Sequence, residues 1–199
     1  MTLTINELIN SIIQILLFTL IPFIWWLITA RKKENFFSWI GLKKPQGDRK
    51  KIIVLMLGAF ALCEVIGMIL NYTVLNTDWN ITQYAGTGTK GLLGSVIFAY
   101  LHTAFSEEII YRGFLQKRLQ KCLGFRIGTI VQAAIFGATH VILALNLITV
   151  TEGIALFIYP MIPAVFIAYI NEKKCEGSII PGWIIHGTLN VITHLMHLW

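Results

Sequence analysis

Residues 92–113, LLGSVIFAYLHTAFSEEIIYRG, place two adjacent carboxylates and an arginine at the end of an apolar run. A charged side chain near the centre of a bilayer costs at least about 2.5–3.5 kcal/mol, and such residues mark functional sites. The whole chain has the composition of a membrane protein. Apolar residues make up 56% of it and charged residues 13%, whereas soluble domains carry about 25% charged residues. We therefore expect residues 92–110 to span a membrane and to carry Glu107 and Glu108 within it.

Further apolar runs have the roughly 20-residue length that a spanning helix needs. They occupy residues 8–28, 52–71, 127–148, 154–170 and 179–198. Together with residues 92–110 they predict an all-α fold, a polytopic bundle of about six transmembrane helices. Basic residues follow the first run and do not precede it, so we expect a retained span rather than a cleaved signal. Pro160 and Pro163 are expected to kink or break the fifth span.

The distribution of basic residues predicts the topology. All of the sixteen Lys and Arg residues except Lys90 fall in the connections after the first, third and fifth runs. The positive-inside rule makes these connections cytoplasmic and places both termini outside, in a multi-pass protein of the cell membrane. The aromatic segment 35–42 is expected to lie in the cytoplasmic interface. Residues 72–90, with Asp78, are expected to form an external loop.

Several classes of function do not fit the sequence. The net charge of +6 comes without a basic groove interleaved with aromatic residues, so nucleic acid is not an expected partner. The odd number of cysteines, without a Cys-x-x-Cys pair, argues against a disulfide framework or a cysteine-rich metal site. A His-Glu-x-x-His zinc motif is absent, and the only aspartates, Asp48 and Asp78, fall in loops. Ser95 with His186 leaves a serine mechanism open, although Gly-x-Ser-x-Gly is missing.

The polar residues within the spans suggest hydrolysis of a peptide bond. Glu108 and Arg112 have the i, i+4 spacing of an ion pair, with the acid in the favourable N-terminal position. Glu107 is left without a local partner, as a general base would be. His186 and Asn190 share a helix face, and both can donate hydrogen bonds to an oxyanion. A third span supplies a histidine four residues after an aromatic ring: Phe136 and His140.

The remaining ionisable residues of the spans are given structural roles. A lone histidine inside a helix commonly makes an interhelical hydrogen bond or a packing contact, and histidines near the interface cost little. We expect this of His102, His194 and His197. Glu64 is expected to be a protonated carboxyl group bonded to a neighbouring helix.

These residues resemble the motifs of a known family. Glu107-Glu108-x-x-x-Arg112, Phe136-x-x-x-His140 and His186-x-x-x-Asn190 are similar to the three motifs of the CAAX-processing and bacteriocin-processing (CPBP or Abi) membrane proteases, the type II CAAX prenyl endopeptidases. The segment 177–181 before His186 also resembles the family's last segment. Tyr111 is a departure, since phenylalanine is usual there. The resemblance extends from about residue 92 to the C-terminus.

The resemblance implies an intramembrane endopeptidase. Glu107 and His140 would activate water, His186 and Asn190 would form the oxyanion site, and Glu108, Arg112 and Phe136 would support the geometry. We expect a glutamate mechanism without a metal, with zinc as the alternative cofactor. We also expect one integrated membrane domain, with N-terminal spans and a basic interfacial loop in residues 1–91 and the catalytic core in residues 92–199.

The expected partners are the lipid bilayer and a small peptide or membrane-associated protein substrate, cleaved near the cytoplasmic side. The alternative function is a non-proteolytic bacteriocin self-immunity protein that acts by binding. A solute transporter fits less well, because no pair of broken half-helices appears in symmetric positions.

Overall fold

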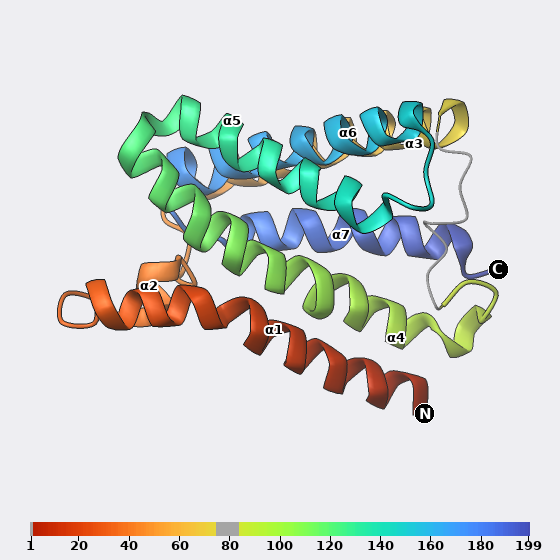
Figure 1. Cartoon of the computed structure of the whole chain (residues 1–199), viewed down its shortest axis with the longest axis horizontal. Helices are drawn as coiled ribbons and strands as arrows, with labels where there is room; N and C mark the ends of the chain where they lie inside the picture. Colours follow the sequence, from red (N-terminus) through yellow and green to blue (C-terminus); the bar gives the residue numbers. More distant parts are fainter. Residues whose placement is uncertain (1, 75–83) are drawn as a thin grey trace.

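The described residues of the chain, 2–74 and 84–199 in this computed structural model, form helices and turns without a β-strand (Figure 1). The helices that cross the bundle are α1 (Thr2–Thr29), α3 (Arg49–Thr73), α4 (Leu92–Ile97), η3 (Phe98–Phe105), η4 (Glu108–Gln116), α5 (Lys117–Ala144), α6 (Val150–Tyr169) and α7 (Ile180–His197). The short elements are α2 (Phe36–Ile40), η2 (Gly88–Lys90) and η5 (Ile170–Lys174). Asp78 and the rest of residues 75–83 of the expected external loop lie outside the described residues.

Within the described residues, four segments are long and apolar enough to cross a membrane: Leu3–Thr29, Arg49–Thr73, Leu92–Ala144 and Val150–Lys174. The third folds back at Gly124, whose φ of 78° suits a residue without a Cβ, and so it supplies two antiparallel legs. Helix α7 is less apolar than these four segments and does not reach the mean hydropathy expected of a spanning helix, but it runs beside them. The chain thus passes six times along the bundle, and both termini lie at one end (Figure 1). The predicted all-α polytopic architecture is confirmed.

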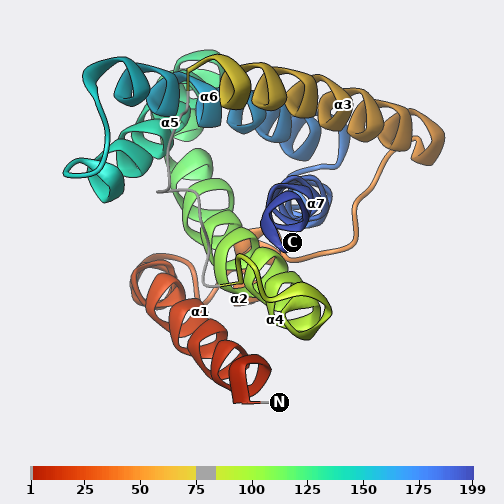
Figure 2. The same cartoon turned by 90° about the vertical axis from the view of Figure 1, so that its right-hand side faces the viewer.

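The helices form three layers (Figures 1 and 2). One layer holds α3, α6 and α5, and the middle layer holds α7 beside the continuous helix α4–η3–η4. Helix α1 packs on the far side of that helix and exposes most of its apolar surface. Leu16 is 64% exposed and Ile28 is 78% exposed. Such a surface on a spanning helix is suited to contact with lipid.

The third and fifth predicted spans differ from the structure. The span predicted to end at residue 110 continues as a helix to Gly124, because Glu108 pairs with Arg112 across a turn and strong helix formers follow. Helix α6 runs unbroken through Pro160 and Pro163. Of the predicted kink or break at these prolines, the break is absent, because neighbouring helices allow a transmembrane helix to tolerate the lost backbone hydrogen bonds.

The helix that carries the two glutamates is wider than an α-helix. The segments η3 and η4 are π-helical and flank Ser106 and Glu107. Local hydroxyl groups satisfy backbone carbonyls there: Ser106 Oγ donates to the carbonyls of His102 and Thr103, and Thr103 Oγ1 donates to Ala99 O at 3.0 Å. π-helical turns occur frequently at functional sites.

The aromatic segment predicted to lie in the interface is docked on the bundle. Asn35 caps α2 by accepting a hydrogen bond from Ser38 N at 3.0 Å, and Gly41 ends it with a φ of 88°. Gly41 then closes against the chain before α7, where Ile179 N donates to Gly41 O at 2.9 Å. A side chain at Gly41 would collide with the carbonyl of Gly177. Segment 35–42 therefore fixes the loop from which α7 starts.

A buried carboxylate joins α1 to the core. Glu7 Oε1 lies 2.7 Å from His102 Nδ1, and Tyr84 Oη donates to Glu7 Oε2 at 2.8 Å. The Glu7 side chain has no exposed surface. His102 thus makes the kind of interhelical contact that the sequence predicted for it. Glu7 was not among the predicted intramembrane residues, because the first apolar run was taken to begin at residue 8.

The Glu7 contacts predict a stability effect. Glu7→Ala would leave the buried Tyr84 hydroxyl and the partly buried His102 ring without their acceptor, which costs about 1–3 kcal/mol. We expect a lower Tm in detergent micelles, measured by intrinsic fluorescence. Asn10→Ala, on the exposed surface of the same helix, is the control and should leave the Tm unchanged. Equal Tm values for the two variants would show that the Glu7 contacts do not stabilise the bundle.

Thiol reactivity should separate the cysteines. Cys122 is exposed, whereas Cys63 and Cys175 are buried. Burial raises the pKa of the Cys175 thiol to about 11, and only the thiolate reacts. At about pH 8 that thiol is ionised in roughly one molecule in a thousand. We expect a maleimide to modify the folded protein at Cys122 alone and the denatured protein at all three cysteines, as measured by mass spectrometry. Rapid modification of Cys175 in the folded protein would contradict this packing.

Candidate active site

A cavity of about 260 Å³ lies between the layer of α3, α5 and α6 and the middle layer of the bundle. Its lining comes from α3, the helix α4–η3–η4, α5, α6 and α7. The four residues predicted to carry the chemistry, from three different spans, all belong to this lining: Glu107, His140, His186 and Asn190. The geometric condition on which the catalytic hypothesis depends, one shared cavity, is therefore met.

His186 lies between the two glutamates. Its Nδ1 is 3.2 Å from Glu108 Oε1, and its Nε2 is 3.6 Å from Glu107 Oε2. A carboxylate only accepts hydrogen bonds, so Nδ1 is the donor to Glu108. This contact fixes the ring and turns the other nitrogen toward Glu107. The two adjacent carboxylates thus contact the two ring nitrogens of one imidazole.

Arg112 connects this pair to α5. Its Nη1 lies 3.2 Å from Glu108 Oε1, and the guanidinium carbon lies 4.2 Å from the centre of the Phe136 ring. Arg112 is 1% exposed and Glu108 0% exposed. Buried charges need partners, and a guanidinium group gains further stabilisation over an aromatic face. The predicted Glu108–Arg112 pair is thus present, and Phe136 covers it.

The hydrogen bond made by His140 determines its tautomer. His140 Nδ1 lies 2.8 Å from the carbonyl oxygen of Phe136, one turn earlier on α5. A carbonyl group only accepts, so Nδ1 carries the proton. The neutral ring then has an unprotonated Nε2 that can accept a proton. The aromatic ring of Phe136 packs edge-on against His140, with the ring centres 4.6 Å apart, and limits its rotation.

Asn190 is held from the opposite helix. Its Nδ2 donates to Thr103 Oγ1 at 2.8 Å. An amide nitrogen has two hydrogens, so one remains available to the cavity. Thr103 itself lines the cavity and lies one turn before Glu107. Its position four residues before the general-base candidate is the sequence signal that could have identified it.

The Glu107 carboxylate is the acceptor that faces the cavity. Its Oε2 is buried and has no hydrogen-bond partner among the described residues. The side chain as a whole is 19% exposed. A carboxylate oxygen in this state can accept a hydrogen bond from a water molecule or a substrate amide. This is the position that a general base requires.

Other lining residues fall outside the predicted set. Glu64, His194 and His197 line the same cavity, whereas His102 pairs with Glu7 on the other side of the α4–η3–η4 helix. The sequence predicts how deep such residues lie in the membrane. It does not predict how their helices are rotated, and therefore not which residues face the cavity. The contact between Glu108 and His186 also went unpredicted, because it joins residues 78 positions apart.

The described residues do not form a metal site. No group of three or more His, Cys, Asp or Glu side chains has an arrangement that could hold a metal ion within the described part of the chain. The described residues therefore show no set of converging ligands of the kind that zinc, the alternative cofactor, needs.

Comparison with known proteins supports the family suggested by the motifs. The sequence profile described as "Type II CAAX prenyl endopeptidase Rce1-like" matches residues 89–192, which contain all three motifs and more than half of the chain. Comparisons with curated proteins and with solved structures gave no match. The six-pass helical bundle, the shared cavity and this match agree, and the chain belongs to the Rce1-like family of type II CAAX prenyl endopeptidases.

Proposed function

We propose that the protein is an intramembrane endopeptidase of the cell membrane that hydrolyses a peptide bond with a water molecule activated by Glu107. The observation that carries the proposal is the convergence of Glu107, His140, His186 and Asn190 on one cavity. Membership of an endopeptidase family supports the reaction class. The chemistry of each side chain supports its role.

Two groups are suited to activate water. Glu107 presents a buried carboxylate oxygen without a hydrogen-bond partner among the described residues, and His140 presents a ring nitrogen without a proton. In the proposed step one of these groups takes a proton from water as its oxygen attacks the carbonyl carbon of the substrate. The proton then passes to the leaving amine as the C–N bond breaks. The products are a carboxylic acid and an amine, so the reaction needs no other reactant.

Two donors are suited to the oxyanion that forms in this step. Asn190 has a free amide hydrogen, and its carboxamide is held by Thr103. His186 has Nε2 directed toward Glu107 while Nδ1 donates to Glu108. With a proton on both nitrogens His186 would donate to the substrate oxygen, and Glu108 would compensate the charge. Donors fixed in advance are effective because they need no reorganisation in the transition state.

The first prediction concerns the proposed base. Glu107→Gln keeps the shape of the side chain but removes the proton acceptor, and general bases contribute about 10²–10⁴-fold to the rate. We expect cleavage of a quenched-fluorescence peptide library by the purified protein to fall by at least about a hundredfold, and similarly for His140→Ala. Glu34→Gln, in an exposed loop, is the matched control and should retain activity. Unchanged cleavage by Glu107→Gln would refute the mechanism.

The second prediction separates the positioning role of Glu108 from stability. Glu108→Gln alone leaves Arg112 as an uncompensated buried charge, at a cost of about 3–5 kcal/mol. The double variant Glu108→Gln/Arg112→Gln removes both charges, so we expect it to recover much of the lost Tm. We expect its activity to stay low and its pH–rate profile to shift, because His186 has lost the carboxylate that accepts from its Nδ1. Recovery of activity together with Tm would mean that Glu108 acts on stability alone.

A further inference from the structure

The cavity is not at equal distances from the two ends of the bundle. One end, here called the cytoplasmic end, contains all Lys and Arg residues except Lys90 and the buried Arg112: those after α1, at the start of α3, around the Gly124 turn and before α7. The other end, here called the outer end, contains both chain termini and the connection between α5 and α6 (Figure 1). The positive-inside rule gives these ends their names.

The lining of the cavity lies on the outer side of the Glu107 carboxylate. Helix α3 begins at the cytoplasmic end, and its lining residues all come from its second half, between Glu64 and Asn71. Helix α7 also begins there, and it lines the cavity only from His186 onward, as far as His197. Helix α6 runs in the opposite direction and contributes residues no later than Pro163. Three helices, two running in one direction and one in the other, thus agree on the direction.

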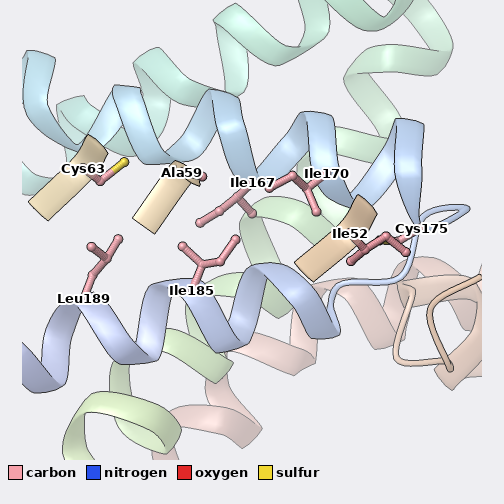
Figure 3. Close-up of a cluster of buried hydrophobic side chains, with 8 residues drawn as sticks. All are labelled: Ile52, Ala59, Cys63, Ile167, Ile170, Cys175, Ile185 and Leu189. Carbon is pink, nitrogen blue, oxygen red and sulfur yellow. The ribbon is translucent and has the colours of Figure 1, made fainter. Parts of the chain in front are cut away.

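The cytoplasmic side of the cavity is filled by apolar side chains. Figure 3 shows the cluster between α3, α6 and α7: Ile52, Ala59, Cys63, Ile167, Ile170, Cys175, Ile185 and Leu189. Leu189 belongs both to this cluster and to the cavity lining, and the other members continue from it toward the cytoplasmic end. On the opposite wall, the Phe136 ring covers the fully buried Arg112. Glu107 and His186 therefore lie at the inner end of a cavity whose cytoplasmic side is packed.

The outer part of the cavity is suited to admit a peptide. Asn71, Thr193, His194 and His197 supply polar groups along it, and Met68 and Met196 supply apolar surface that is 41% and 49% exposed. A peptide backbone entering a membrane site needs polar partners, while an apolar segment gains from contact with methionine. Both kinds of surface lie on the outer side of Glu107.

We propose that the substrate reaches Glu107 from the outer side of the membrane. The substrate is then an exported peptide or the outward-facing segment of a membrane protein, not a prenylated tail on the cytoplasmic surface. This inference rests on the proposed function, because only an enzyme has a substrate. The side on which the cavity opens can nevertheless be measured independently of catalysis. It replaces the expectation from the sequence that cleavage occurs near the cytoplasmic side.

Cysteine accessibility in intact cells tests the proposal. Thr193→Cys places a thiol in the cavity, one turn beyond Asn190. Leu147→Cys, in the exposed connection between α5 and α6, is the outer reference, and native Cys122 is the cytoplasmic reference. Both variants are made on a Cys122→Ser chain, whose other cysteines are buried. The probe is a membrane-impermeant maleimide, applied before and after permeabilisation.

We expect Thr193→Cys and Leu147→Cys to be modified in intact cells at least about ten times more than Cys122, and all three after permeabilisation. Modification of Thr193→Cys only after permeabilisation would overturn the proposal. So would a Thr193→Cys that stays unmodified under both conditions, because the cavity would then be closed. Modification of Leu147→Cys only after permeabilisation would mean an inverted orientation, which also overturns it.

A second readout connects access with catalysis. A bulky impermeant maleimide attached to Thr193→Cys should reduce cleavage of the peptide library at least about tenfold relative to the unmodified variant, whereas the same group on Leu147→Cys should not. Full activity of modified Thr193→Cys would refute this route for the substrate. Absence of cleavage by the unmodified wild-type protein would instead count against the proposed function, and the labelling pattern would still decide the side of the opening.

Discussion

The structure depends on the burial of the Glu108 carboxylate. Removing a carboxylate from water costs several kcal/mol, even after the protein relaxes, and only well-placed partners offset that cost. Glu108 has two: Arg112 on its own helix and His186 on α7. Each partner lies 3.2 Å from the same oxygen, Oε1. Helix α7 must therefore pack at one rotation and one depth against η4, because any other would leave this carboxylate without its second partner.

The same charge determines the position of the remaining site residues. Arg112 lies over the Phe136 ring, and the backbone of Phe136 accepts the hydrogen bond from His140. Asn190 follows His186 by one turn of α7 and reaches Thr103. Helix α7 can approach Glu108 this closely because Gly182 has no side chain. A Cβ atom at this position would lie 2.7 Å from Glu108 Oε2. One buried ion pair thus holds groups from three spans against a single cavity.

Local features of this arrangement follow from the sequence, and long-range ones do not. The i, i+4 spacings relate Glu108 to Arg112, Phe136 to His140 and His186 to Asn190, and each pair lies on one helix face, as the geometry of a helix requires. The contacts of Glu108 with His186 and of Glu7 with His102 join different helices. They depend on helix rotation, which hydropathy and charge counts do not specify. The motifs therefore predicted which residues meet but not which glutamate orients the histidine.

The topology could be predicted because it depends on sums over many residues, whereas helix ends depend on a few. Apolar runs and basic connections predicted the passes and placed both termini at the same end, in agreement with the bundle. The continuation of η4 into α5 depends on the Glu108–Arg112 pair and on helix formers that a hydropathy window counts as polar. The unbroken helix α6 depends on neighbours that a single-helix rule for proline ignores.

Helix α7 shows how a polar site is reconciled with a membrane. It carries two of the four proposed catalytic residues and falls short of the hydropathy of a spanning helix. Figure 2 shows it between the layer of α3 and α6 and the helix that begins with α4. Its Ile185 and Leu189 pack into the apolar cluster with α3 and α6, while His186 and Asn190 face Glu108 and Thr103. Because both faces are covered by protein, the polar face is removed from lipid, and the cavity is where that cover is incomplete.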